Sequence, residues 1–281
     1  IFFLIFFNFF LLKEIFSKNT DEVIKFLYLF AFSFFNLSFN RIAEYGTDKV
    51  GQLLIVILVI KIFQHICYDK NKFKINNILY LIPLIGFCIS LKTYFLPYIL
   101  LGLTIILLDF KSLENLKKIF FSKPFFIFLI SLMVYFFHHF ISTGCIISPI
   151  SATCLGNNLD WAYSANSYER FSKGLELWAK AGRGPGFEVE NTHTYIENFN
   201  WVSRWYTNYF LGKFLDQLLL LTSVFFVIFL LFKNFKHKKK IFKFDKKHLF
   251  FFTIIFTIFL VWFLKHPQLR YGGYPIVFLT V

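Results

Sequence analysis

A short stretch near the end of the chain gathers residues that can bind an anion. The sequence KHPQLRYGGYPIVF, residues 265–278, places His266, Arg270 and Tyr271 directly after a long apolar run. Arginine suits this task because its planar guanidinium can donate to two oxygens of a phosphate or carboxylate at once. Between other apolar runs lie the cations Arg41 and Lys92 and the carboxylates Glu44 and Asp48. Together, these residue types can hold an anion and accept a proton.

The composition indicates the class of protein that must position these residues. Hydrophobic residues make up 57% of the chain and charged residues 16%, whereas a soluble domain usually carries about 25% charged residues. Several stretches approach the roughly 20 apolar residues that cross a bilayer. The sequence therefore predicts an all-α fold, a polytopic bundle of transmembrane helices. Because the chain begins inside an apolar run at Ile1 and ends as another begins, we expect a fragment truncated at both ends.

The net charge of +14 is concentrated in three links between apolar runs. Lysines cluster within residues 70–74, 111–123 and 233–247. Cytoplasmic links of membrane proteins carry an excess of Lys and Arg, so these three links are predicted to lie on the inner side. A nucleic-acid partner is not expected, because no binding module accompanies the lysines.

Placing the three basic links inside predicts the rest of the topology. The stretch 73–109 has basic links at both ends, and a single helix of that length would be about 55 Å long, so two spans with an outer turn near Lys92 fit better. The predicted spans lie near residues 1–12, 24–39, 50–67, 73–90, 93–109, 124–142, 213–232 and 248–264, with another starting near Tyr274. In this arrangement the stretch 41–49, Lys92 and the stretch 265–273 all fall on the outer face. The chain divides into transmembrane helices (1–142), an outer loop (143–212) and further transmembrane helices (213–281).

The outer loop is too long for a simple connector and is predicted to carry amphipathic helices. Tyr168, Phe171, Leu175 and Trp178 recur at helical spacing. The pairs Glu169/Lys173 and Glu176/Lys180 are spaced i,i+4 on the predicted opposite face. A second helix is expected to begin near Thr194. These helices either cap the outer ends of the spans at the membrane interface or roof a groove for a lipid-linked substrate.

The outer loop also contains two cysteines and a glycine-rich stretch. Cys145 and Cys154 flank residues 146–153, and an oxidising compartment favours a disulfide between them, the alternative being two free thiols. The stretch Gly182 to Phe187 suits a mobile loop between the two helices. No metal or cofactor is expected: His138 and His139 are adjacent on a predicted helix and point to different sides, and no CxxC pair is present.

Two sequence motifs carry a resemblance to known membrane proteins. HPQLRYGGYP resembles the Arg-Tyr-x-x-x-Pro feature at the outer start of a late span in lipid-dependent glycosyltransferases of the GT-C fold, the protein O-mannosyltransferase and aminoarabinose-transferase type. The matching residues are Arg270, Tyr271 and Pro275. RIAEYGTD (41–48) and GCIISPISATC (144–154) are still more similar to a family of uncharacterised bacterial polytopic membrane proteins related to that class.

The resemblance implies a transferase of the bacterial inner (cytoplasmic) membrane that acts on its periplasmic face. Its donor would be a polyprenyl-phosphate-linked sugar, its acceptor a cell-surface glycan or lipid, and membrane lipids its surroundings. Such an enzyme must bind an anionic phosphate and deprotonate an acceptor hydroxyl, so Asp48 or Glu44 is expected to act as the base. Gly272 and Gly273 would let the backbone approach the ligand. The residues expected to bind the substrate are Arg270, His266, Arg41, Lys92 and Tyr271.

Other interpretations of the same charges remain open. In the plainest interpretation, ion pairs hold the span ends together, and they form among Arg41, Glu44, Asp48 and Arg270. An O-antigen polymerase or ligase would share the long outer loop and the outer arginines. A transporter or flippase of lipid-linked substrates would more often carry charges or broken helices at mid-membrane.

Overall fold

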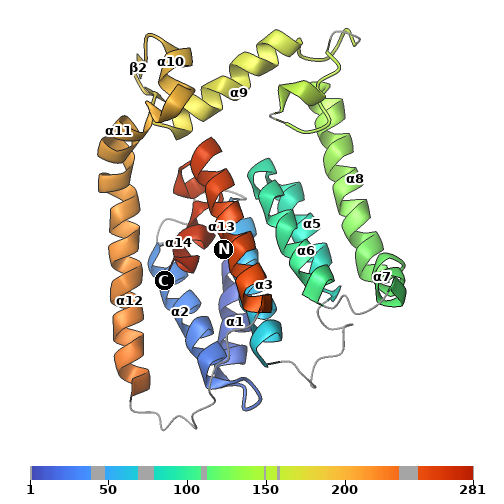
Figure 1. Ribbon diagram of the computed structural model, residues 1–281, viewed down its shortest axis with the longest axis vertical. Helices are drawn as coiled ribbons and strands as arrows, with labels where there is room; N and C mark the ends of the chain where they lie inside the picture. Colours follow the sequence, from blue (N-terminus) through green and yellow to red (C-terminus); the bar gives the residue numbers. More distant parts are fainter. Residues whose placement is uncertain are drawn as a thin grey trace.

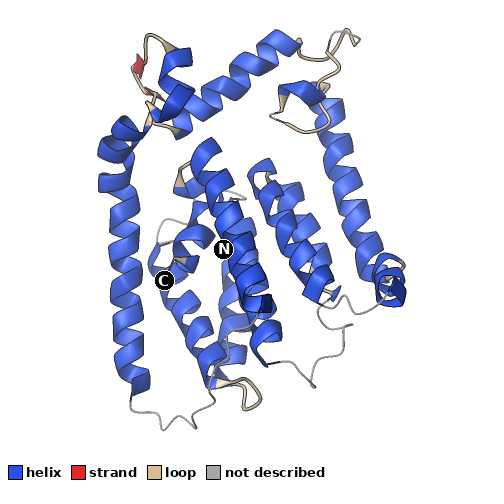
Figure 2. Ribbon diagram, viewed as in Figure 1, coloured by secondary structure: helices blue, strands red, loops and turns tan. Residues whose placement is uncertain are grey.

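The protein is a bundle of helices, as Figure 1 and Figure 2 show. The computed structural model describes residues 2–38, 48–68, 79–108, 113–148, 150–156, 159–233 and 246–280. Within these ranges, the only sheet is an antiparallel hairpin of β1 (Arg183–Gly184) and β2 (Phe187–Glu188). The predicted all-α class is therefore confirmed.

The helices of the bundle follow the apolar runs of the sequence. The segment predicted as a span at 124–142 is α8, and those at 213–232 and 248–264 are α12 and α13. The bundle helices are α1 (Phe2–Phe16), α2 (Glu22–Ser38), α3 (Asp48–Tyr68), α5 (Ile82–Leu91), the 3₁₀ turn η2 (Thr93–Tyr98), α6 (Ile99–Leu108), α7 (Leu113–Phe120), α8 (Lys123–Thr143), α12 (Leu215–Lys233), α13 (Lys246–Lys265) and α14 (Tyr274–Leu279).

Four described helical stretches are long and apolar enough to cross a membrane. They are Asp48–Ile66, Lys123–Thr143, Val202–Phe232 and Lys246–Lys265, and two shorter apolar helices span Ile82–Leu91 and Thr93–Leu107. The protein is thus a membrane protein by length and composition of its helices. The full number of crossings and their direction stay predictions.

The spanning helices differ in how much protein surrounds them. In α3, 56% of the apolar window is buried inside the protein, but only 11% in α8. The helix α3 contacts α2, α5 and α14, whereas α8 packs mainly against α5. Large apolar side chains such as Met133 and Phe137 therefore face outward from α8, which is the surface expected to meet lipid.

A helical roof crosses one end of the bundle. Figure 1 shows α9 (Ala165–Ala179) running from the end of α8 toward α11. The roof continues through the hairpin, α10 (Thr192–Ile196), η4 (Glu197–Phe199) and α11 (Val202–Trp205), and then through the π-helical stretch η5 (Tyr206–Phe214) into α12. Between α13 and the turn η6 (Leu269–Gly273), Gln268 contacts this roof, because its side-chain Nε2 donates to the Trp178 carbonyl at 2.8 Å.

The helix α9 exposes part of its apolar stripe and buries one of its charged residues. The side chains of Phe171 and Trp178 are 54% and 37% exposed. Lys180, predicted on the face opposite the apolar stripe, is only 3% exposed. Its ammonium lies 2.5 Å from a Glu176 carboxylate oxygen and 4.9 Å from the centre of the Trp201 ring. This pairing and the ring offset the cost of burying the charge.

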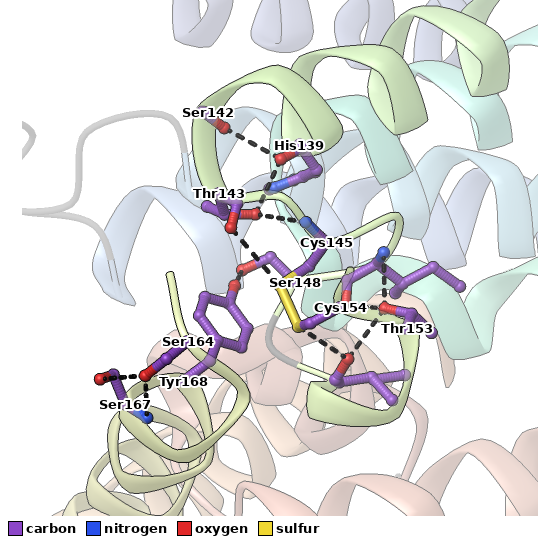
Figure 3. Close-up of a disulfide and its surroundings, with 12 residues drawn as sticks. His139, Ser142, Thr143, Cys145, Ser148, Thr153, Cys154, Ser164, Ser167 and Tyr168 are labelled. Atoms are coloured by element: carbon purple, nitrogen blue, oxygen red, sulfur yellow. Dashed lines mark hydrogen bonds between the residues drawn. A yellow bond between two sulfur atoms is a disulfide. The ribbon is translucent and has the colours of Figure 1, made fainter. Parts of the chain in front are cut away.

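A disulfide closes the loop where α8 meets the roof. The structure joins Cys145 and Cys154, the pair that the sequence favours, and Figure 3 shows the surrounding hydrogen bonds. Beside it, the Leu155 amide donates to the Gly144 carbonyl at 2.8 Å. From α9, the Tyr168 hydroxyl meets the Ser148 hydroxyl (Figure 3). The loop therefore ties the end of α8 to the start of the roof.

Candidate functional site

A buried carboxylate lies under the roof, paired with two cations. Asp48 is the first residue of α3, where the helix dipole favours a negative charge. Its Oδ1 lies 3.4 Å from the Lys92 Nζ, and its Oδ2 lies 3.9 Å from an Arg270 guanidinium nitrogen. We call these three residues the Asp48 cluster. The fold thus brings together three charged residues that are far apart in the sequence, with several helices between Asp48 and Arg270.

The two cations of the cluster are far more exposed than the carboxylate. The side chains of Lys92 and Arg270 are 45% and 53% exposed, compared with 7% for Asp48. The Arg270 guanidinium lies over the Tyr271 ring at 5.4 Å from its centre. The Tyr94 hydroxyl is buried beside the Asp48 carboxylate, although not in good hydrogen-bond geometry. Donors of both cations therefore remain open to a ligand from outside the bundle.

The backbone around Arg270 is held by side chains from several helices. Pro267 and Gln268 lie outside any helix, and the π-helical turn η6 is interrupted by non-helical backbone at Tyr271 and Gly272, so several polar groups here need partners from elsewhere. Such fixation holds a binding group in place before a ligand arrives. The contacts are Trp205 Nε1 to the Pro267 carbonyl (2.7 Å), Trp262 Nε1 to the Gln268 carbonyl (3.0 Å), the Leu269 amide to the Tyr209 hydroxyl (2.6 Å), Gln52 Nε2 to the Arg270 carbonyl (3.1 Å) and the Tyr98 hydroxyl to the Gly272 carbonyl (2.8 Å).

Gly272 and Gly273 allow close packing of residues 267–273, which we call the fixed turn. Contrary to our expectation, they do not bring the backbone close to a ligand. Gly272 has φ of +83°, a left-handed conformation that side chains rarely adopt. At Gly273, a Cβ would lie 2.8 Å from an atom of the Trp262 ring. Both glycines are buried. They allow the turn to pack closely against aromatic side chains of the bundle.

His266 does not supply the positive charge predicted for it. Burial lowers the pKa of its ring, and the nearby Lys265 and Lys180 lower it further, against an opposing effect from Glu176. The Nδ1 atom is buried and has no hydrogen-bond partner among the residues that the structure describes. The ring lies 5.6 Å from that of Tyr271, measured between centres. At neutral pH, His266 therefore acts as an uncharged packing partner of Tyr271.

A pocket separates the roof from the fixed turn. It has a volume of about 290 Å³. One wall is the exposed face of α9, with Phe171, Leu175 and Trp178, and the hairpin adds Arg183. Arg270 and Tyr271 form the opposite wall, and no Asp or Glu of the described residues lines the space. A positively charged pocket with one apolar wall can accept an anion attached to an apolar chain.

The predicted site residues fall into two groups. Asp48, Lys92, Arg270, Tyr271 and His266 lie together around the fixed turn. By contrast, Arg41 and Glu44 lie outside the described residues.

Three residues of the site were missed by sequence reasoning. Gln52 is one helical turn after Asp48, and this spacing on an otherwise apolar helix is a signal that could have found it. Tyr94 carries no distinguishing pattern among so many aromatic residues. Arg183 was overlooked because its glycine-rich surroundings were interpreted as a mobile loop.

Comparison with known proteins places the chain in a family. Residues 1–277 match the family described as Domain of unknown function (DUF8201), and the chain therefore belongs to this family. No curated protein and no solved structure matches it.

Proposed function

We propose that this member of the DUF8201 family is a GT-C-like membrane glycosyltransferase. It transfers a sugar from a polyprenyl-phosphate donor to a cell-surface glycan or lipid, on the periplasmic face of the bacterial inner membrane. The observation that supports the proposal best is the position of Arg270, a half-exposed cation on a firmly held backbone, between a buried carboxylate and a pocket that no acid of the described residues lines.

In this proposal Arg270 binds the donor phosphate. The bond between the sugar C1 and the phosphate oxygen breaks during transfer, and negative charge grows on that oxygen. A preorganised cation acting on developing charge is usually the largest single contribution to catalysis. The side-chain contacts to residues 267–272 supply the preorganisation, because they fix the backbone that carries Arg270.

Asp48 both positions Arg270 and acts as the base. When Arg270 pairs with the donor phosphate, its long contact to Asp48 Oδ2 (3.9 Å) is replaced. This oxygen then accepts the proton of the acceptor hydroxyl while the acceptor oxygen bonds to the sugar C1. Lys92 stays with Oδ1 at 3.4 Å and holds the carboxylate in position.

The exposed face of α9 accepts the apolar chain next to the phosphate. Phe171, Leu175 and Trp178 stand on the pocket wall and are not packed into the bundle. Covering them with an isoprenoid chain removes apolar surface from water, which favours binding by about 25 cal/mol per Å². The exposed face thus supports the interpretation of α9 as the roof of a substrate groove.

The test is complementation of a deletion strain by Arg270→Lys. Lysine keeps the charge but loses the two-oxygen fork, so we expect surface-glycan formation to fall by about 10²-fold or more at an unchanged amount of protein in the membrane. Arg170→Lys, at an exposed position of α9, is the matched control. Wild-type glycan from Arg270→Lys, or no lipid-linked glycan accumulating in the deletion strain, would refute the proposal.

A further inference from the structure

We infer that the pocket beneath α9 binds a diphosphate, with Arg183 and Arg270 each holding one phosphate group. The donor would then be a sugar linked to a polyprenyl diphosphate. This inference rests on the proposed function, which supplies the lipid-linked class of ligand. It adds a role for Arg183 and the number of phosphates.

Two arginines reach the same pocket from separate parts of the fold. Arg270 comes from η6 at the end of the bundle, and Arg183 comes from β1 in the roof. Their carboxylate partners, Asp48 and Glu188, pair with them at 3.9 and 3.7 Å, and among the described residues no acid lines the pocket itself. An anion with two phosphate groups can satisfy both guanidinium forks, because each fork pairs with two oxygens.

The local structure orients Arg183 and leaves part of its fork available. Its Nε lies 3.7 Å from a Glu188 carboxylate oxygen across the hairpin, and both side chains are about half exposed, so this pair is weak. Gly174 gives the guanidinium room on the wall of α9, since a Cβ there would lie 2.9 Å from Nη1. Any other residue at position 174 would push Arg183 away from its present place.

The chemistry of the walls favours an amphiphile over a free anion. Phe171 and Trp178 are large, exposed and on the same wall as Gly174. Two cations above an apolar face match a strongly charged head group attached to an apolar chain. A polyprenyl monophosphate would use Arg270 alone and leave Arg183 with only its weak pair to Glu188.

The test is a binding titration of the purified protein in a non-ionic detergent. Trp178 lines the pocket, so tryptophan fluorescence can report farnesyl diphosphate and farnesyl phosphate, with inorganic pyrophosphate as the head group alone. We expect the wild type to bind farnesyl diphosphate at least about tenfold more tightly than farnesyl phosphate, the size of effect of one charge-assisted contact. Arg183→Gln should remove this difference and leave farnesyl phosphate binding unchanged. Arg170→Gln should behave as the wild type, and pyrophosphate should bind more weakly than farnesyl diphosphate.

Two outcomes would overturn the inference. One is a wild type that does not distinguish the two lipids, and the other is an Arg183→Gln variant that still does. Pyrophosphate that binds as tightly as farnesyl diphosphate would contradict the role of the apolar wall. Failure of the proposed function would give a different result. In that case the wild type and Arg183→Gln would bind the two lipids as expected here, but Arg270→Lys would still restore the surface glycan.

Discussion

Two charge clusters lie along α3, and they differ in what surrounds their cations. Toward the far end of the helix, Lys61 Nζ lies 3.0 Å from a Glu14 carboxylate oxygen, and the Thr20 hydroxyl donates to the other oxygen at 3.3 Å. The rings of Phe10 and Tyr28 lie 5.5 and 5.6 Å from the Lys61 ammonium. We call Glu14 and Lys61 the Glu14 pair. It lies about 20 Å along the helix from Asp48.

The contrast separates a structural ion pair from a binding site. In the Glu14 pair, each carboxylate oxygen has a partner and aromatic rings flank the cation, so the pair links α1 to α3. In the Asp48 cluster, one carboxylate meets two cations at longer distances, and both cations are about half exposed. Asp48 and Arg270 do form the ion pair that the plain interpretation names, but at 3.9 Å, and the short, flanked contact of a purely structural pair is found at Glu14 instead. The open donors of the Asp48 cluster instead fit a ligand.

Asp48→Asn should give the largest effect that distinguishes the two clusters. The change keeps the shape of the side chain but removes the proton acceptor, and a general base is typically worth about 10²–10⁴ in rate. We expect sugar transfer to fall by that factor, measured as the rate of surface-glycan formation per amount of membrane protein. A variant that transfers normally would show that Asp48 is not the base, and one absent from the membrane would show that it is structural.

Glu14→Gln should affect stability and not transfer. It leaves the Lys61 charge without its partner, and because the pair is only partly buried the cost should be up to about 3 kcal/mol. The thermal midpoint in detergent should fall, while the rate per folded molecule stays at the wild-type value. The double change Glu14→Leu with Lys61→Met should recover most of the loss, since it removes both charges. A lower rate in Glu14→Gln at full stability would erase the contrast between the clusters.

The roof disulfide should affect stability by an amount similar to that of the Glu14 pair. Closing the short loop from Cys145 to Cys154 is worth about 2–3 kcal/mol in the chain-entropy account, so replacing both residues by Ser should lower the thermal midpoint by the corresponding amount. Alkylation with and without reductant, followed by mass spectrometry, checks the bond itself. Two freely modified thiols in the unreduced protein would contradict it.

The smallest predicted effect is a pH dependence from His266. Burial lowers its pKa, so the folded protein binds this proton less readily than the unfolded chain, whose histidine titrates near 6.5. The contribution of the uncharged His266 to the free energy of unfolding should therefore be fully present above about pH 6.5 and decrease as the pH falls below this value. Glu176 opposes the shift, and Lys180 and Lys265 reinforce it. In His266→Gln, the thermal midpoint should depend less on pH in that range, and an unchanged dependence would exclude His266 as its source.

The sequence predicts the helices of the bundle well because membrane spans are long apolar runs. The end of α13 and the start of α3 were expected on one face from the lysine-rich links alone, and Asp48 and Arg270 do meet there. Side-chain orientation in the roof was harder to predict. Lys180 is buried because Glu176 and Trp201 provide its partners, and periodicity alone treats a lysine as a solvent residue.

The details of the fixed turn could not be predicted for a different reason. Its partners, such as Trp205 and Gln52, come from helices far away in the sequence. Side-chain contacts to irregular backbone follow no repeating pattern. The roles of Gly272 and Gly273 were misjudged on this account, since the atoms they accommodate belong to other helices.

We propose that the Asp48 cluster, and not the Glu14 pair, binds an anionic lipid. The most direct test is the rise in thermal midpoint that farnesyl phosphate causes in detergent, since a ligand that binds only the folded protein stabilises it by RT ln(1 + [L]/Kd). We predict the same rise in the wild type and in Glu14→Gln, and none in Arg270→Gln. An equal rise in Arg270→Gln, or none in the wild type, would show that the Asp48 cluster does not bind this lipid.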